Sequence, residues 1–451
     1  MEIVIDFPNL NSNPLVLMWW FFRTIGWIIP VFFFVLVLIF GWQSYIRNHY
    51  RTKRKYILLA IDVPKDNEQT PKAAENIFNH LAGAHQPLEF HDKWWTGEIP
   101  NSFSLEIVSL GGYIQFIVHL VEEYRDMVEA MIYAQYPDAE ITEVEDYTKK
   151  WNIKFPNEEY KFWGTELKLR ASEFYPIRTY TEFEDKVSKE AYKDSMAAML
   201  ESMTRIGPGE EIWVQLVITP ADNDWYEGSE SVIDKIIGAK GKEKHSLFKS
   251  AADFVGYVAN SVISTTEASS NHGGETPNQM LYLTPGKKDV VAAIEKKTSK
   301  VGYHTKIRLV YIAEKDKYKK RIPHGVYGAF KQFNTYDLNS IKPDSKTLTG
   351  GVVFFKKTRL TWRSNKMLYR YKSRGHWLEP GYYGKVFNTE ELATLYHFPV
   401  SASVKTPSVQ RTESKKSQPP ISLPTEEFRV EPVDQFELNT ASAAPPEDLP
   451  T

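Results

Sequence analysis

The chain has 451 residues, of which 42% are hydrophobic and 14% aromatic, so it has enough apolar side chains for more than one folded core. It contains no cysteine, which excludes disulfide frameworks, thiolate metal sites and cysteine nucleophiles. The formal charge is -2, but residues 61–230 are acidic and residues 281–385 basic, so we expect these regions to attract one another or different partners.

The first element expected along the chain is a transmembrane helix. Residues 24–42 carry no charge and would span about 28 Å as a helix, close to the hydrocarbon thickness of a bilayer. Tryptophans flank this run, and basic residues cluster at 47–55. The positive-inside rule then places residues 56–451 in the cytoplasm, with the helix in the inner membrane. The alternative, a cleaved signal peptide, requires a basic start, a shorter apolar core and small residues at a cleavage site.

Residues 56–150 are expected to form one α/β unit. A buried strand at 56–63 leads to an amphipathic helix at 73–81, and two apolar runs joined at Gly111 and Gly112 suit a hairpin. A second helical stripe and a last strand follow. The order β-α-β-β-α-β is that of a ferredoxin-like fold.

Residues 151–345 repeat this pattern in part. Strong strands are expected at 211–219 and 303–313, each next to a helical stripe. Between them, the polar run near 260–279 indicates an exposed flexible insertion. We therefore expect a second α/β unit.

Beyond residue 345 the chain is first basic and then rich in proline and serine. Residues 354–375 can form a basic helix or two short strands, and we favour the helix. Asn388 with Glu391 three residues later indicates a capped helix start. The predicted fold is thus α+β, with one N-terminal transmembrane helix, two ferredoxin-like (βαββαβ or related) units and a disordered C-terminal tail. The expected segments are an extracytoplasmic N-terminus (1–14), a membrane segment (15–46), a basic juxtamembrane stretch (47–55), the two α/β domains (56–150 and 151–345), a basic helical segment (346–403) and the tail (404–451).

No motif of a known catalytic site occurs in the sequence. GxxxxGK[ST], GxSxG, HExxH and GxGxxG are all missing, and the nearest glycine-lysine runs, at 238–242 and 381–385, have the wrong spacing for a phosphate loop. His80, His85 and His91 match no metal-binding spacing. We expect no enzyme activity, no cofactor and no metal.

Two stretches are candidates for contacts with other molecules. Trp94 and Trp95 are a candidate protein interface, with core packing of at least one of them as the alternative. A basic stretch interleaved with aromatic residues has the chemistry of a nucleic-acid surface. Its alternatives are a solvated helix face or docking on the acidic first domain of the same chain. The candidate nucleic-acid residues are Arg359, Arg363, Arg370 and Arg374.

Three phrases resemble a known family. SLGGYIQFIVHLVEEYRDMVEAMIYAQYPDAEITEVEDY (109–147), AFKQFNTYDLNSIKP (329–343) and FNTEELATLYHFPVSASVKTP (387–407) are similar to the N-terminal, non-motor region of membrane-anchored conjugative, type IV secretion-like coupling ATPases of bacteria. The resemblance covers most of residues 56–407. In that family it implies a region between a transmembrane helix and a RecA-like motor. No Walker lysine, Walker acid or arginine finger has a counterpart here.

The resemblance and the residues together suggest a role in binding. We expect a non-enzymatic, membrane-anchored accessory or scaffold subunit of a type IV secretion-like complex, for conjugative DNA or protein translocation. It would act with a motor ATPase on a separate chain and form homo- or hetero-oligomers. The alternatives are a membrane-tethered nucleic-acid-binding protein and an envelope scaffold unrelated to DNA transfer.

Overall fold

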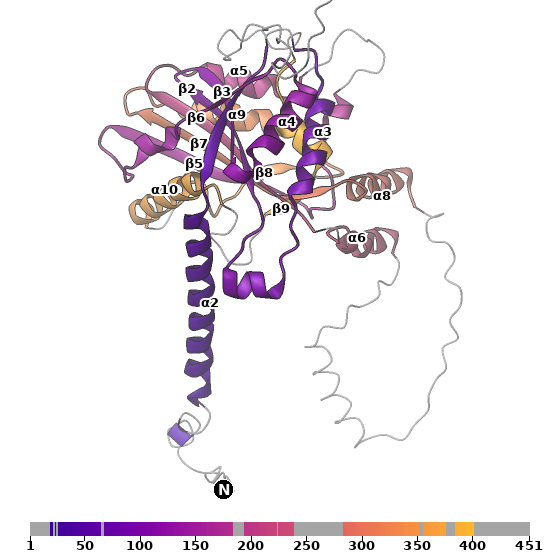
Figure 1. Cartoon of the computed structure of the whole chain (residues 1–451). Helices are drawn as coiled ribbons and strands as arrows, with labels where there is room; N and C mark the ends of the chain where they lie inside the picture. Colours follow the sequence, from indigo (N-terminus) through magenta and orange to yellow (C-terminus); the bar gives the residue numbers. More distant parts are fainter. Residues whose placement is uncertain are drawn as a thin grey trace, which may run out of the picture. The chain divides into compact units, whose positions relative to one another are not determined.

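The computed structural model describes residues 19–20, 23, 26–64, 67–183, 194–222, 224–238, 283–350, 355–375 and 384–400 (Figure 1). The predicted N-terminus (1–14), flexible insertion (260–279) and tail (404–451) lie outside these described residues. The helices and strands, in chain order, are α2 (Ile28–Lys53), β1 (Tyr56–Asp62), α3 (Pro71–Leu81), the short π-helix η3 (Asp92–Thr96), β2 (Phe103–Leu110), β3 (Tyr113–Val121), α4 (Arg125–Gln135), β4 (Glu140–Glu143), β5 (Tyr160–Leu169), α5 (Ala197–Thr204), β6 (Glu210–Pro220), α6 (Glu227–Ile237), α8 (Pro285–Thr298), β7 (Gly302–Glu314), α9 (Arg321–Phe330), β8 (Ile341–Pro343), α10 (Lys356–Ser373), β9 (Lys385–Asn388) and α11 (Thr389–Leu395).

Helix α2 is long and apolar enough to span a membrane. Between Ile28 and Phe40 its apolar side chains are exposed, except that of Leu36, as expected of a helix that is solvated by lipid. The helix continues past Trp42 to Lys53, and Ile46 in this last part is buried against the rest of the chain. From Ile28 onward, the predicted membrane segment therefore forms one continuous helix with the basic juxtamembrane stretch as far as Lys53.

The strands form one nine-stranded sheet, with β9 beside β7 and the others in the order β4-β1-β3-β2-β6-β7-β5-β8. The eight strand pairings among the residues that the structure describes are antiparallel. The mixed α+β class is confirmed, but the two expected α/β units do not have separate sheets: their strands belong to one large antiparallel sheet. Strands β2 and β6 pair from Phe103↔Ile218 to Leu110↔Glu211. If β2 and β6 did not pair, each would be an apolar strand at the edge of a sheet, with backbone N–H and C=O groups that need other partners.

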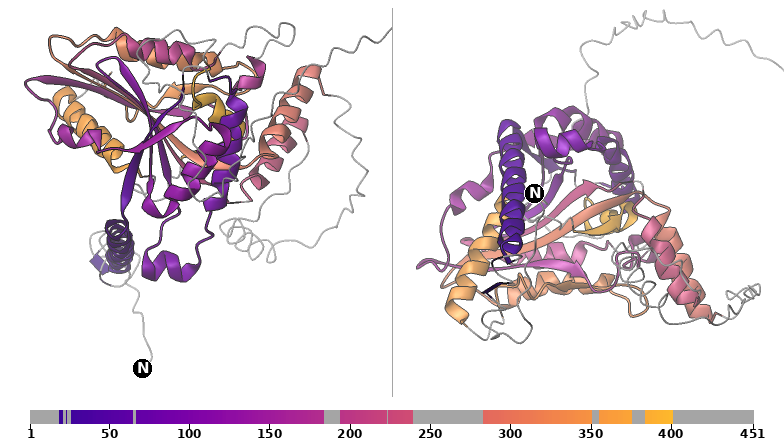
Figure 2. Two further views of the ribbon diagram at one scale, coloured as in Figure 1. Left: turned by 45° about the horizontal axis from the view of Figure 1, so that its top comes forward. Right: turned by 90° about the horizontal axis from the view of Figure 1, so that it is seen from below.

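Both faces of the sheet are covered. Helices lie on both sides of the sheet in Figure 2. Within β6, Val214 and Leu216 lie in a large core with side chains of α3, α4, α5, α9 and α11. Trp213 packs on the other face, with Met367, Leu368 and Tyr371 of α10. The same alternation separates Leu309 from Val310 in β7. Burial on both faces explains why these strands read as continuous apolar runs.

Other predicted elements occur at the expected places. The Gly111-Gly112 turn joins β2 to β3, with φ of 60° and 98° at the two glycines. The basic segment forms helix α10 and not two strands. Asn388 and Glu391 form the predicted capping box at the start of α11. The sequence patterns predicted neither β8 nor β9, which have three and four residues.

Candidate functional site

A row of polar side chains crosses the centre of the sheet beneath α10. Glu106 of β2 is paired with Gln215 of β6, Gln215 with Arg308 of β7, and Arg308 with Glu166 of β5. Gln215 Nε2 donates to Glu106 Oε1 at 2.8 Å, and Arg308 Nη1 donates to Gln215 Oε1 at 2.8 Å. Arg308 Nε lies 3.1 Å from Glu166 Oε1. We call these four residues the polar row.

Arg374, at the end of α10, closes one end of the polar row. Its side chain is 2% exposed, with Nε 2.8 Å from Glu106 Oε1 and Nη1 2.7 Å from Asp146 Oδ2. Burial raises the pKa of Glu106, but the charge and hydrogen bond of Arg374, with smaller effects of His119 and Ser104, together hold that pKa below its ordinary value. Burial also raises the pKa of Asp146, but the hydrogen bond and charge of Arg374, with further hydrogen bonds from Thr148, lower that pKa to about 2. Both carboxylates therefore stay ionised at neutral pH.

Arg370 closes the other end of the row. It is 8% exposed, and its Nη1 lies 3.5 Å from Glu166 Oε2. Arg308 also donates to the backbone carbonyls of Arg370 and Gly375, so the row holds α10 by both side chain and backbone. Two of the four arginines expected to contact nucleic acid are thus buried in ion pairs. Their guanidinium groups are covered and do not face solvent.

The alternative of docking on the acidic first domain fits Arg374, since Glu106 and Asp146 both belong to residues 56–150. Arg359 and Arg363 remain toward the surface, Arg359 exposed and Arg363 half-buried. Arg363 Nη1 donates to the Leu348 carbonyl at 2.8 Å.

A cleft of about 430 Å³ opens between α10 and the β5–β8 edge. Its cationic lining includes Lys168, Lys346, Arg363 and Lys366, and Lys366 Nζ lies 4.5 Å from the ring centre of Trp362. Trp362 is 59% exposed. Cations beside an exposed aromatic ring suit a polyanion with flat bases. The anionic lining, Glu166 and Asp344, offsets part of this charge.

Trp94 and Trp95 lie in η3, beside α2. Trp95 is 65% exposed, and Trp94 is half-buried. The indole Nε1 of Trp42 donates to the Trp94 carbonyl at 3.0 Å. Core packing therefore does not describe Trp95, and both tryptophans lie next to the helix that is apolar enough to cross a membrane.

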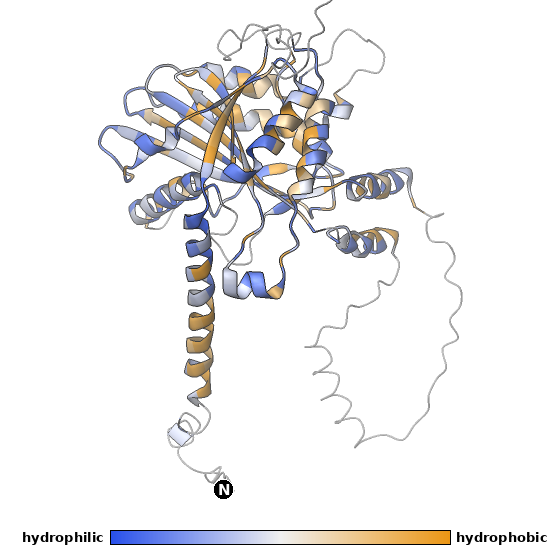
Figure 3. Ribbon diagram, in the orientation of Figure 1, coloured by the Kyte–Doolittle hydropathy of each residue, from blue (hydrophilic) through white to orange (hydrophobic). Residues whose placement is uncertain are grey.

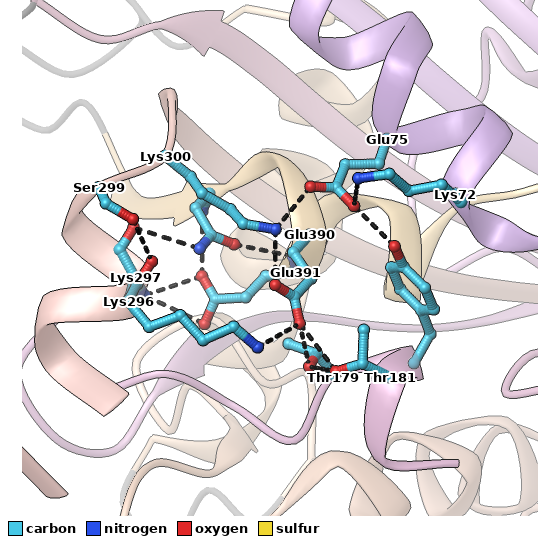
Figure 4. Close-up of polar contacts among 12 residues, drawn as sticks. Lys72, Glu75, Thr179, Thr181, Lys296, Lys297, Ser299, Lys300, Glu390 and Glu391 are labelled. Carbon is cyan, nitrogen blue, oxygen red and sulfur yellow. Dashed lines mark hydrogen bonds and ion pairs between the residues drawn. The ribbon is translucent and has the colours of Figure 1, made fainter. Parts of the chain in front are cut away.

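Figure 4 shows a second group of charges, around the start of α11. Lys297 Nζ lies 2.8 Å from Glu391 Oε2, and neither side chain is exposed. Lys300 Nζ bridges Glu75 Oε1 at 2.6 Å and Glu390 Oε2 at 2.7 Å. Burial raises the pKa of Glu390, but hydrogen bonds, led by that from Lys300, lower it to about 2. The group fastens α11 to α3 and to the end of α8.

The patterns used to predict sites missed both groups of buried charges. A visible signal existed, because Glu106, Gln215 and Arg308 each stand between two apolar residues of a strand, and a polar or charged group that is buried in such a place needs a partner. Among the described residues, no three or more His, Asp or Glu side chains are placed to hold a metal ion. His85 instead lies 3.4 Å from Asp222.

Comparison with known families gives one match. Residues 48–412 match the family described as Domain of unknown function (DUF8128), and the chain belongs to this family. The match begins within α2 and includes every strand of the sheet. None of the curated proteins matches the sequence.

Proposed function

We propose that this DUF8128 protein is a non-enzymatic, membrane-anchored scaffold of a type IV secretion-like translocation complex, and that it acts with a motor ATPase on a separate chain. The observation that carries the proposal is the continuity of α2 with the folded region. The apolar part of α2 passes directly into turns that bind the sheet domain: Arg51 Nη2 donates to the Ser373 carbonyl at 3.1 Å, and Arg54 Nη1 to Asn101 Oδ1 at 2.8 Å. A helix fastened in this way holds the sheet domain next to the membrane.

The orientation follows from the basic residues at 47–55. Lysine and arginine next to a transmembrane helix favour the cytoplasmic side. The sheet domain would then lie at the cytoplasmic face of the inner membrane, where a translocation motor has access to nucleoside triphosphate. A scaffold in that position can bring the motor and the membrane-embedded parts together.

We further infer that the sheet consists of two fused ferredoxin-like units. The strand order β4-β1-β3-β2 has the same connectivity as β8-β5-β7-β6, and the two halves meet where their second strands, β2 and β6, pair. In the second half, α6 and α8 lie between the strands that a hairpin joins in the first. The order in each half, fourth-first-third-second, is that of a βαββαβ unit.

This arrangement bears on how copies or partners would assemble. The outer strands β4 and β8 have only four and three residues, and β4 carries exposed Glu140 and Glu143. Short, charged edge strands disfavour pairing with a further sheet. Oligomers or hetero-complexes would therefore form through helices and loops and not through sheet edges.

The test is affinity capture of the full chain from its native membrane, in detergent and after crosslinking, with identification of the proteins that accompany it. Recovery of a RecA-like ATPase supports the proposal. Repeated recovery of envelope proteins without any ATPase would leave a structural envelope scaffold as the better account.

A second candidate function, a membrane-tethered nucleic-acid-binding protein, is favoured by the cationic cleft beside Trp362. If the cations of the cleft neutralise phosphates of single-stranded DNA, the affinity for that DNA should fall steeply as the salt concentration rises. The charge reversals Arg363→Glu and Lys366→Glu should weaken it, whereas Lys288→Glu, on the exposed surface of α8, should not. Equal binding by all three variants would exclude the cleft as the binding site.

A further inference from the structure

Residues 86–97, which we call the aromatic loop, pack directly on the backbone of α2 (Figure 1). Gly97 has a φ of 72°, and a Cβ atom added there would lie 2.6 Å from the backbone carbonyl carbon of Ile46. Such an approach is open only to glycine. Together with the bond from Trp42 to the Trp94 carbonyl, this contact fixes the loop beside the helix.

The two contacts also give the loop a direction. Gly97 meets α2 at Ile46, and Trp94 meets it at Trp42, four residues nearer the apolar part. Four residues are about 6 Å along a helix. The loop thus runs from the polar end of α2 toward its apolar part, and Figure 3 shows α2 changing from polar to apolar beside the loop.

The side chains near this level are those of a membrane interface. Phe90 is 70% exposed and Trp95 65%, and their ring centres lie 6.4 Å apart. Trp42 and Tyr45 of α2 are exposed as well. Lys93 adds an exposed cation. Aromatic rings with neighbouring cations gather where hydrocarbon meets headgroups, since one part of the side chain is apolar and another polar.

We propose that the aromatic loop inserts Phe90 and Trp95 into the headgroup–acyl boundary of the membrane that α2 crosses. A single helix leaves a domain free to rotate about the helix axis, whereas a second contact beside it fixes which side of the sheet domain faces the bilayer. The inference rests on the proposed anchoring by α2. It assigns the candidate interface at Trp94 and Trp95 to lipid.

The protein has no cysteine, so single cysteines can be introduced without background. Phe90→Cys and Trp95→Cys are labelled with an environment-sensitive fluorophore, and the full chain is reconstituted into phosphatidylcholine–phosphatidylglycerol vesicles that contain nitroxide lipids. The matched control is Tyr113→Cys, also 70% exposed but at the far end of β2, an eight-residue strand about 26 Å long. Phe33→Cys, in the middle of the apolar part of α2, reports the anchoring itself.

We expect a nitroxide just below the headgroups to quench the labels at positions 90 and 95 several-fold more than the label at position 113. A nitroxide at the bilayer centre should quench the label at position 33. If Phe33 is quenched but the loop labels behave as Tyr113 does, the loop proposal is wrong. If the loop labels become shielded only after native membrane extract is added, the loop binds protein and the proposal is also wrong. If Phe33 is not quenched, anchoring by α2 is what fails.

Discussion

Replacing Arg374 by methionine tests whether the polar row holds the fold together or serves a ligand. In the native chain, Arg374 makes two close ion pairs, with Glu106 and Asp146. Arg374→Met removes both and leaves the Glu106 carboxylate fully buried without a cation. Breaking a buried pair in this way costs about 3–5 kcal/mol. Glu106 keeps the hydrogen bonds from Ser104 and Gln215, which favours the lower part of that range.

The loss should depend on pH in a defined direction. In the native chain the pKa of Glu106 lies below its ordinary value of 4.5, so its contribution to stability is present above that value. Without Arg374, burial is the largest remaining effect on Glu106 and raises its folded-state pKa above the unfolded one, because the causes that still lower the pKa, such as the Ser104 hydrogen bond, are smaller. The free energy of unfolding of the variant then falls as pH rises above the unfolded pKa, by about 1.4 kcal/mol per unit until the folded pKa is passed. The difference in free energy of unfolding between the native chain and the Arg374→Met variant should therefore be smaller at pH 5 than at pH 8.

Guanidinium unfolding of the detergent-solubilised full chain, followed by tryptophan fluorescence, measures both effects. Arg359→Met is the control, because Arg359 is exposed on the same helix and should change the free energy of unfolding by less than about 0.5 kcal/mol. Adding Glu106→Gln to Arg374→Met should recover about 0.5–3 kcal/mol by removing the stranded charge. If Arg374→Met is as stable as Arg359→Met but loses DNA binding, the polar row does not stabilise the fold and Arg374 contacts ligand.

Three further changes test the other contacts. Gly97→Ala should detach the aromatic loop and increase its cleavage by protease, whereas Gly83→Ala, where an added Cβ meets nothing within 4 Å, should leave cleavage unchanged. Lys297→Met should lower the free energy of unfolding by about 3–5 kcal/mol, but Lys296→Met, whose side chain is 61% exposed, by at most about 1 kcal/mol. The folded-state pKa of Glu390 is about 2, against an ordinary value of 4.5. Its contribution to the free energy of unfolding, about 3 kcal/mol, should therefore be complete above pH 4.5 and disappear as pH falls through 2. In the Glu390→Gln variant, the free energy of unfolding should depend less on pH in this range.

Local patterns predicted the elements of this fold well, because the strands carry long apolar runs and their turns carry glycine. They did not predict which strands meet in the middle. Nothing in the sequence near β2 or β6 specifies that these strands pair with each other, since about a hundred residues lie between them. The short strands β8 and β9 were not predicted for a related reason. The four residues of β9 form a strand because they pair with β7, for example Lys385 with Thr305, and not because of their own sequence.

The arginines of α10 show the same limit for sites. In the sequence these arginines belong to one basic stretch, yet Arg374 is buried against Glu106. Because Glu106 lies 268 residues earlier in the chain, the local sequence does not reveal this contact. The excess of acid in residues 61–230 and of base in residues 281–385 did indicate such an attraction, and Arg374–Glu106 and Lys300–Glu75 are examples of it. Composition can thus predict that two regions attract, but not which side chains are covered when they meet.

The division of α10 into two parts bears on any proposal of DNA contact. Its C-terminal half, with Arg370 and Arg374, is held by the polar row, and the backbone carbonyl of Ser373 accepts from Arg51 of α2. The N-terminal half, with exposed Lys356, Lys357 and Arg359, presents charge to solvent. Because the same helix contacts both α2 and the sheet, a ligand bound near Arg359 would be held at a set distance from α2. Charge reversal in the N-terminal half therefore separates a role in binding from a role in folding, whereas changes at Arg370 or Arg374 would confound the two.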